Sequence, residues 1–231
     1  MSCQNKLCWY ELIPLFSFLV LKGRCRNCKT KISSQYILVE FATGLIFCLL
    51  FLKFQDILFI STSIFAITYA YYAIMFSLLI VIVVYDLRHK IIPNTLSLFF
   101  GVLAFVGLFF FHLNYFDNFS SYSIFYWQIP SMLEFLSGIL ISLPFCLFWL
   151  ISRGAWMGLG DAKLVLGLGY FLGLSLVFSA VVLAFWIGAI MGLGLVVFKK
   201  GYGMKSEIPF APYLVLGTFI VFFFNLHLFV I

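Results

Sequence analysis

The chain has 231 residues, of which 65% are hydrophobic and only 10% are charged, and its mean hydropathy is +1.16. A soluble domain has about 25% charged residues, so this composition excludes an ordinary soluble protein and predicts an all-α, polytopic bundle of transmembrane helices. The formal net charge of +6 does not indicate a nucleic-acid partner, because the basic residues of membrane proteins gather in cytoplasmic loops.

The N-terminal part is the most polar part of the chain. We expect residues 1–35 to form a small cytoplasmic segment and residues 36–231 to form one membrane domain. Within the first segment, residues 12–21 are apolar but too short to span a bilayer, and "KGRCR" follows them in place of a small-residue cleavage site. This pattern predicts an interfacial or re-entrant segment rather than a signal peptide.

Seven apolar runs follow, and each predicts a membrane-spanning helix. The start of the second run is poorly defined, because residues 57–86 are apolar throughout, and the fifth and sixth runs almost touch. The seven predicted spans are roughly 36–54, 64–86, 94–113, 131–152, 163–176, 178–198 and 209–230.

The basic residues predict the orientation of these spans. With the N-terminal segment in the cytoplasm, 13 of the 14 Lys and Arg residues lie inside and only Lys53 lies outside. The loop 114–130 contains no Lys or Arg and is predicted to be external. The other segments predicted to be cytoplasmic are 87–93, 153–162 and 199–208.

This orientation brings two carboxylates to the same membrane face. Asp86 ends the second span and Asp161 begins the fifth. An ionisable group at membrane depth indicates function. Two close carboxylates cannot easily both ionise and so hold one proton between them, which lets one take a proton from water while the other donates to a carbonyl oxygen. Two plainer alternatives remain, namely that Asp161 is a helix N-cap and that Asp86 is an interfacial residue beside Arg88.

Five motifs occur in one order along the chain. They are "WYELIPLFSFLVLKGRCRNC" (9–28), "YILVEFATGLIF" (36–47), "DLRHKIIPN" (86–94), "GLGDAKLVLGLGYFLG" (158–173) and "IPFAPYLVLG" (208–217). In this order they resemble the type IV prepilin leader peptidases, a bacterial family of di-aspartyl GxGD intramembrane peptidases with prepilin peptidase and N-methyltransferase activity.

The resemblance implies an aspartic endopeptidase of the bacterial inner membrane. Such an enzyme removes the short basic leader of type IV prepilins or pseudopilins at the cytoplasmic face, with Asp86 and Asp161 as the catalytic pair. Cleavage needs no cofactor, and membrane lipid is the other expected partner. Bifunctional members also methylate the new N-terminus with S-adenosylmethionine. The residues that we expect to support catalysis or bind substrate are Gly158, Gly160, Lys163, Asn94 and Pro209.

The N-terminal region departs from the family pattern. Members usually begin with another transmembrane helix, whereas this chain starts at Met1 without it, which predicts that peptidase activity is more complete here than methyl transfer. Members also carry two Cys-x-x-Cys pairs thought to bind zinc. Cys25 and Cys28 form one such pair, Cys3 matches half of the other, and Cys8 is a candidate fourth ligand. The alternative is that these are reduced cytoplasmic cysteines with no metal.

Two other functions are alternatives for the same residues. A presenilin or signal-peptide-peptidase type of protease would carry its aspartates on consecutive helices, whereas two predicted spans separate Asp86 from Asp161. A transporter or proton channel could use the two aspartates as relay sites, and would be favoured by interrupted helices in both halves. The only such break in the sequence is the Gly-rich turn near 158–160.

The small-residue stripes at Gly169/Gly173 and Ala184/Gly188/Gly192 predict close helix packing, with a substrate groove as the alternative.

Overall fold

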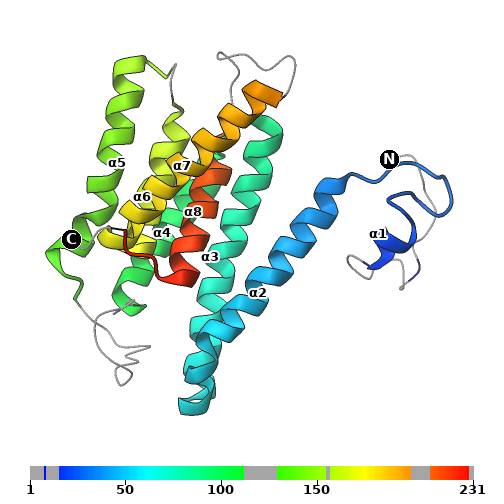
Figure 1. The fold of residues 1–231 in the computed structure, drawn as a ribbon. Coiled ribbons are helices and arrows are strands. Elements are labelled where there is room, and N and C mark those ends of the chain that lie inside the picture. Colours follow the sequence, from blue (N-terminus) through cyan, green and yellow to red (C-terminus); the bar gives the residue numbers. More distant parts are fainter. Residues whose placement is uncertain (1–7, 9–15, 112–128, 155–156, 199–208, 229–231) are drawn as a thin grey trace. The chain divides into compact units, whose positions relative to one another are not determined.

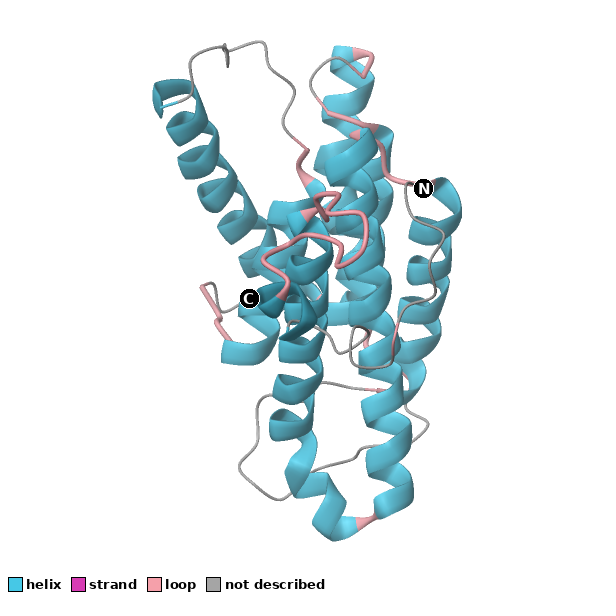
Figure 2. Cartoon of the chain, turned by 90° about the vertical axis from the view of Figure 1, so that its right-hand side faces the viewer, coloured by secondary structure: helices cyan, strands magenta, loops and turns pink. Residues whose placement is uncertain are grey.

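The structure is a computed structural model that describes residues 8, 16–111, 129–154, 157–198 and 209–228. The chain divides into two compact units, residues 1–52 and residues 53–231, and each unit is considered by itself. The described residues consist of helices and loops, with no strand longer than a single bridge (Figure 2). The prediction of an all-α architecture is therefore confirmed for this part of the chain.

The first unit contains a short helix, a hairpin and the start of a long helix. Helix α1 spans Phe16–Val20 and is far too short to cross a bilayer. The hairpin that follows is closed by a bridge between Arg24 and Lys31. Helix α2, Ser34–Ile60, begins directly after it and continues into the second unit. Residues 12–15 lie outside the described residues, so the expected interfacial or re-entrant segment stays a prediction.

One helix corresponds to each of the seven predicted spans, and two of these helices have only 14 residues. The helices after α2 are α3 (Thr62–His89), α4 (Asn94–Phe110), α5 (Met132–Ser152), α6 (Leu159–Leu172), α7 (Leu174–Phe198) and α8 (Ala211–Phe224) (Figure 1). By length and apolar composition, α2, α3, α5 and α7 could each cross a membrane, while α4 and α8 are shorter apolar helices. The protein is therefore a polytopic helical membrane protein.

Several helix boundaries differ from the predicted ones. Helix α2 runs on through Gln55 and Asp56 to Ile60, so that only Ser61 separates it from α3, because no Gly or Pro interrupts the helix there. Helix α8 is shorter than predicted and ends where Asn225 adopts a left-handed conformation with φ 54°, a common helix stop. Helix α6 begins at Leu159, four residues before the predicted start at 163, and this shift changes the position of Asp161 within the helix.

Small residues allow the helices of the second unit to pack closely. Helix α6 packs mainly against α4 and α5, and α8 packs mainly against α7. A Cβ added to Gly169 on α6 would lie 2.5 Å from the Gly138 Cα on α5, and the Ser137 hydroxyl donates to the Gly169 carbonyl oxygen at 2.9 Å. A Cβ on Gly217 of α8 would overlap the Ala180 carbonyl oxygen of α7. The predicted packing role is thus confirmed for Gly169.

An aromatic cluster joins the three helices that matter most for the site. Phe76 of α3, Phe171 of α6 and Phe222 of α8 are buried, and their ring centroids lie 5.1 to 5.9 Å apart. Such ring pairs contribute about 0.5–1.5 kcal/mol each beyond the area that they bury. The cluster holds the three helices against one another at one level of the bundle.

Candidate active site

The buried face of α3 ends in a carboxylate. Its buried residues recur every three or four positions and are Thr68, Tyr72, Met75, Phe76, Leu79, Ile82 and Asp86. This spacing places them on one side of the helix. Asp86 therefore points into the bundle, where only 5% of its surface is exposed, and a charged residue at the end of an otherwise apolar stripe is the signal that the sequence offers for function.

The N-terminus of α8 meets this carboxylate. The backbone N–H of Ala211, the first residue of α8, donates a hydrogen bond to Asp86. Free N–H groups and the helix dipole make a helix N-terminus favourable for an anion. The second carboxylate oxygen, Asp86 Oδ2, is buried and has no hydrogen-bond partner among the described residues. One oxygen of Asp86 is thus held in place, and the other is left for a proton, a water molecule or substrate.

Asp161 lies in the first turn of α6. The N-cap position belongs to Gly158, so the alternative that Asp161 is itself the N-cap is wrong. Asp161 is three residues further on and accepts a hydrogen bond from the Gly158 backbone N–H, which is the acidic half of a capping box. The early start of α6 is what moves Asp161 from the cap to the third helical position.

The two carboxylates act on each other. Asp86 and Asp161 are close enough for their charges to repel electrostatically. The ends of α3, α6 and α8 that carry Asp86, Asp161 and Ala211 lie at the same end of the second unit (Figure 1). The structure therefore brings together the two aspartates that the sequence paired by their position in the membrane.

Two of the expected glycines play different parts. Gly160 packs against the loop between α3 and α4, since a Cβ there would lie 2.9 Å from the Ile92 Cβ. The lack of a side chain lets the "DLRHKIIPN" and "GLGD" motifs approach each other. Gly158, with φ −74° and ψ 146°, is in an extended conformation open to any residue, so its backbone conformation does not require a glycine.

Lys163 and Asn94 join α6 to α4. Lys163 Nζ donates to Asn94 Oδ1 at 2.8 Å. Asn94 is the first residue of α4 and Pro93 is its N-cap, so Asn94 does not occupy the capping position of this helix. Pro209 lies two residues before α8 begins and is half-buried. Ala211, whose contribution is a backbone N–H, was not found from the sequence, where its only signal is a proline at the start of the last helix.

The cysteine residues are only partly described. Cys25 and Cys28 lie on the hairpin turn, where the Cys25 N–H donates to the Thr30 carbonyl oxygen at 2.9 Å and the Cys28 thiol contacts the Thr30 hydroxyl. Cys8 is exposed, and Cys3 lies outside the described residues. No group of three His, Cys, Asp or Glu side chains converges among the residues that the structure describes.

Paired carboxylates at one end of a polytopic helical bundle define a candidate membrane-embedded aspartic peptidase. Residues 73–193 match the model of the "Type IV leader peptidase family", and residues 1–54 match that of the "Bacterial Peptidase A24 N-terminal domain". The chain belongs to the type IV leader peptidase family. The match over residues 73–193 contains both Asp86 and Asp161. Membership of this family argues against the two alternatives that the sequence left open, a presenilin-like protease and a transporter.

Three relatives illustrate the match, and each is named "Prepilin leader peptidase/N-methyltransferase". The protein from Xanthomonas campestris pv. campestris is 31% identical over 96% of this chain and 70% of its own length. The relative from Aeromonas hydrophila is 30% identical over 94% of this chain and 68% of its own. The relative from Bacillus subtilis is 28% identical over 96% and 79%. No solved structure matches the chain.

Proposed function

We propose that this protein is an aspartic endopeptidase that removes the leader of type IV prepilins or pseudopilins, with Asp86 and Asp161 as its catalytic pair. The observation that carries the proposal is the convergence of these two carboxylates at one end of the bundle in a member of the leader peptidase family.

The chemistry follows from two carboxylates that share one proton. The ionised carboxylate takes a proton from a water molecule, whose oxygen attacks the scissile carbonyl carbon. The protonated carboxyl donates its proton to the carbonyl oxygen, giving a neutral tetrahedral diol. Collapse of the diol breaks the C–N bond, and the leaving amine receives a proton from the pair. The unpartnered Asp86 Oδ2 is suited to hold the water or the shared proton.

The test is direct. Purified protein in detergent is incubated with a prepilin, and the product is analysed by mass spectrometry. We expect loss of the leader. An intact prepilin, with a characterised leader peptidase active under the same conditions, would contradict the proposal.

Methyl transfer is a second candidate activity. The relatives carry "N-methyltransferase" in their names, and the chain matches the family's N-terminal domain over residues 1–54. S-adenosylmethionine would supply the methyl group. No strand followed by a Gly-rich loop occurs in the described part of the chain, so we assign none of these residues to the cofactor. The mass of the mature pilin in the same experiment distinguishes methylated from unmethylated product.

The proposed topology has seven spans in the bacterial inner membrane, with the catalytic end in the cytoplasm. It is supported by the distribution of basic residues and by the correspondence of one helix to each predicted span. Four of these helices are long and apolar enough to cross a membrane. We expect a cysteine introduced at Ser121, outside the described residues, to react with a membrane-impermeant reagent in intact cells when the native cysteines are replaced. A cysteine at Arg88 should react only after lysis. Reversal of the two results would contradict the orientation.

Zinc binding is proposed for the N-terminal segment. Cys25 and Cys28 lie on one tight hairpin, which is the spacing and setting of a zinc-ligand pair, and Cys3 and Cys8 are the other candidates. We expect protein purified without chelator to contain about one zinc per chain, and the Cys25→Ser and Cys28→Ser variants to lose it. Elemental analysis that finds no zinc in the unmodified protein would refute the proposal. Peptidase activity should survive in the variants, because the carboxylate pair needs no metal.

A further inference from the structure

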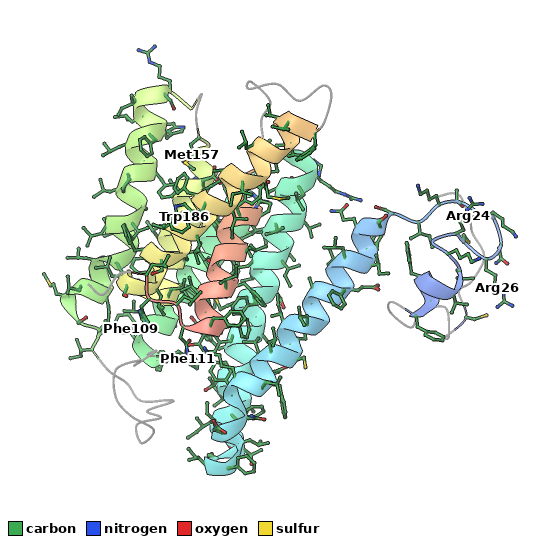
Figure 3. All side chains as sticks on the ribbon, viewed as in Figure 1. Arg24, Arg26, Phe109, Phe111, Met157 and Trp186 are labelled. Atoms are coloured by element: carbon green, nitrogen blue, oxygen red, sulfur yellow. The ribbon has the colours of Figure 1, made fainter. Side chains whose placement is uncertain are left out.

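The hairpin of residues 22–32, here called the basic hairpin, carries the highest density of positive charge in the described chain. Lys22, Arg24, Arg26, Lys29 and Lys31 are all exposed. Between residues 16 and 39 there is no Asp or Glu. Figure 3 shows Arg24 and Arg26 with their side chains extending outward from the hairpin backbone.

Backbone hydrogen bonds fix two of these charges opposite each other. The Cys25 N–H donates to the Thr30 carbonyl oxygen at 2.9 Å, and the Ile32 N–H donates to the Gly23 carbonyl oxygen at 2.8 Å. Arg24 and Lys31 form the antiparallel bridge between these bonds, which makes them a non-hydrogen-bonded pair. Side chains of such a pair share one face of the ladder and are the closest cross-strand neighbours.

This arrangement is unfavourable without an anion. Like charges directly opposite each other across two strands destabilise the pairing. Within the described residues, no carboxylate forms an ion pair with Arg24 or Lys31. An anionic group between the two cations would turn the repulsion into two attractive contacts, and phosphate oxygens suit both guanidinium and ammonium groups.

The position in the chain selects the source of the anion. Helix α2, a candidate membrane span, begins at Ser34, two residues after Ile32, so the C-terminal end of the basic hairpin lies within about 10 Å of the start of this span. On the other side, α1 exposes the apolar side chains of Phe16 and Val20, with 64% and 62% of their surfaces accessible. Basic and apolar side chains next to a membrane span are typical of a segment that lies on the bilayer.

We propose that the basic hairpin is a binding surface for anionic lipid headgroups, with a lipid phosphate between Arg24 and Lys31. The proposal does not depend on the peptidase activity. It assigns the hairpin to the membrane rather than to the prepilin leader. The family resemblance implies a basic leader, and the positive charge of the hairpin would repel a basic peptide.

Hydrogen exchange of the full chain in lipid nanodiscs tests the proposal. The reporters are the Cys25 and Ile32 amides, which close the hairpin. Discs of phosphatidylcholine alone are compared with discs that contain phosphatidylglycerol. We expect exchange of both amides to be about tenfold to thirtyfold slower with the anionic lipid, and the difference to shrink at high salt. Amides within α8 serve as the internal control and should not respond.

Variants separate lipid binding from a merely structural role. In the double variant Arg24→Gln, Lys31→Gln the repulsion is gone, so we expect more protection than wild type in phosphatidylcholine discs and no further gain from the anionic lipid. The matched control Arg24→Lys should keep the lipid response. Equal exchange of the wild type in the two kinds of disc would overturn the proposal. It would also be overturned if inorganic phosphate in phosphatidylcholine discs, at matched ionic strength, protected the amides as well as the anionic lipid does.

Discussion

Replacing either Asp86 or Asp161 with Asn is expected to slow prepilin cleavage on the order of 100- to 10,000-fold, the range attributed to a single acid–base group. An amide can neither take a proton from water nor donate one as a carboxylic acid does. Either substitution therefore breaks the proton sharing on which the proposed mechanism depends. The rate is measured as leader loss from a prepilin, with the variant and the wild type at equal concentration in the same detergent.

The folded structure should tolerate these substitutions. An Asn oxygen at position 86 can still accept from the Ala211 N–H, and one at position 161 can still accept from the Gly158 N–H. Each substitution also replaces an ionisable group at membrane depth, which is costly, with a neutral amide. The matched control is Asp56→Asn, at an exposed position near the end of α2, which should leave the rate unchanged. A near wild-type rate in either the 86 or the 161 variant would show that the residue is not catalytic.

The sequence predicted which helices exist better than where they begin. Each apolar run became a helix, because length and hydropathy decide that outcome in a membrane protein. The start of α6 was misplaced by four residues, because Gly158 and Gly160 have low helix propensity and the boundary is set by tertiary contact. Gly160 fits against Ile92, and a contact of this kind between distant segments has no signature in a local pattern.

The aspartate pair could be predicted, whereas its surroundings could not. Asp86 and Asp161 stand out because carboxylates are rare in apolar runs. The hydrogen bond from Lys163 to Asn94 and the approach of the Ala211 N–H to Asp86 depend on how α4, α6 and α8 pack. A backbone N–H is present at every residue except proline. The residue type at position 211 therefore does not indicate that its N–H donates to a carboxylate.

The aromatic cluster explains how three helix ends meet so closely. Phe76 lies ten residues before Asp86, Phe171 ten residues after Asp161, and Phe222 eleven residues after Ala211. At 1.5 Å per residue the cluster therefore lies about 15 Å from the site along each helix. Rings packed at this one level fix the mutual spacing of α3, α6 and α8, while the polar groups at their ends make few contacts that could do so.

Gly217→Ala should impair the site from a distance. A Cβ at this position would overlap the Ala180 carbonyl oxygen on α7, and a backbone atom cannot swing aside as a side chain can. Helix α8 must therefore shift, and its N-terminus, six residues away at Ala211, must shift with it. Because a displacement of about 1 Å can cost on the order of 100-fold in rate, we expect kcat to fall about tenfold to a hundredfold. Overpacking should also destabilise the fold by about 1–3 kcal/mol.

The matched control for this substitution is Gly194→Ala on the neighbouring helix. A Cβ at Gly194 would meet no atom within 4 Å, and alanine is a better helix former than glycine by about 1 kcal/mol. We therefore expect unchanged cleavage and equal or higher thermal stability in this variant. Cleavage rates and melting temperatures in detergent are measured for both variants. If Gly217→Ala behaves like Gly194→Ala, the contact between α7 and α8 does not set the position of the Ala211 N–H, and Asp86 must be held by other groups.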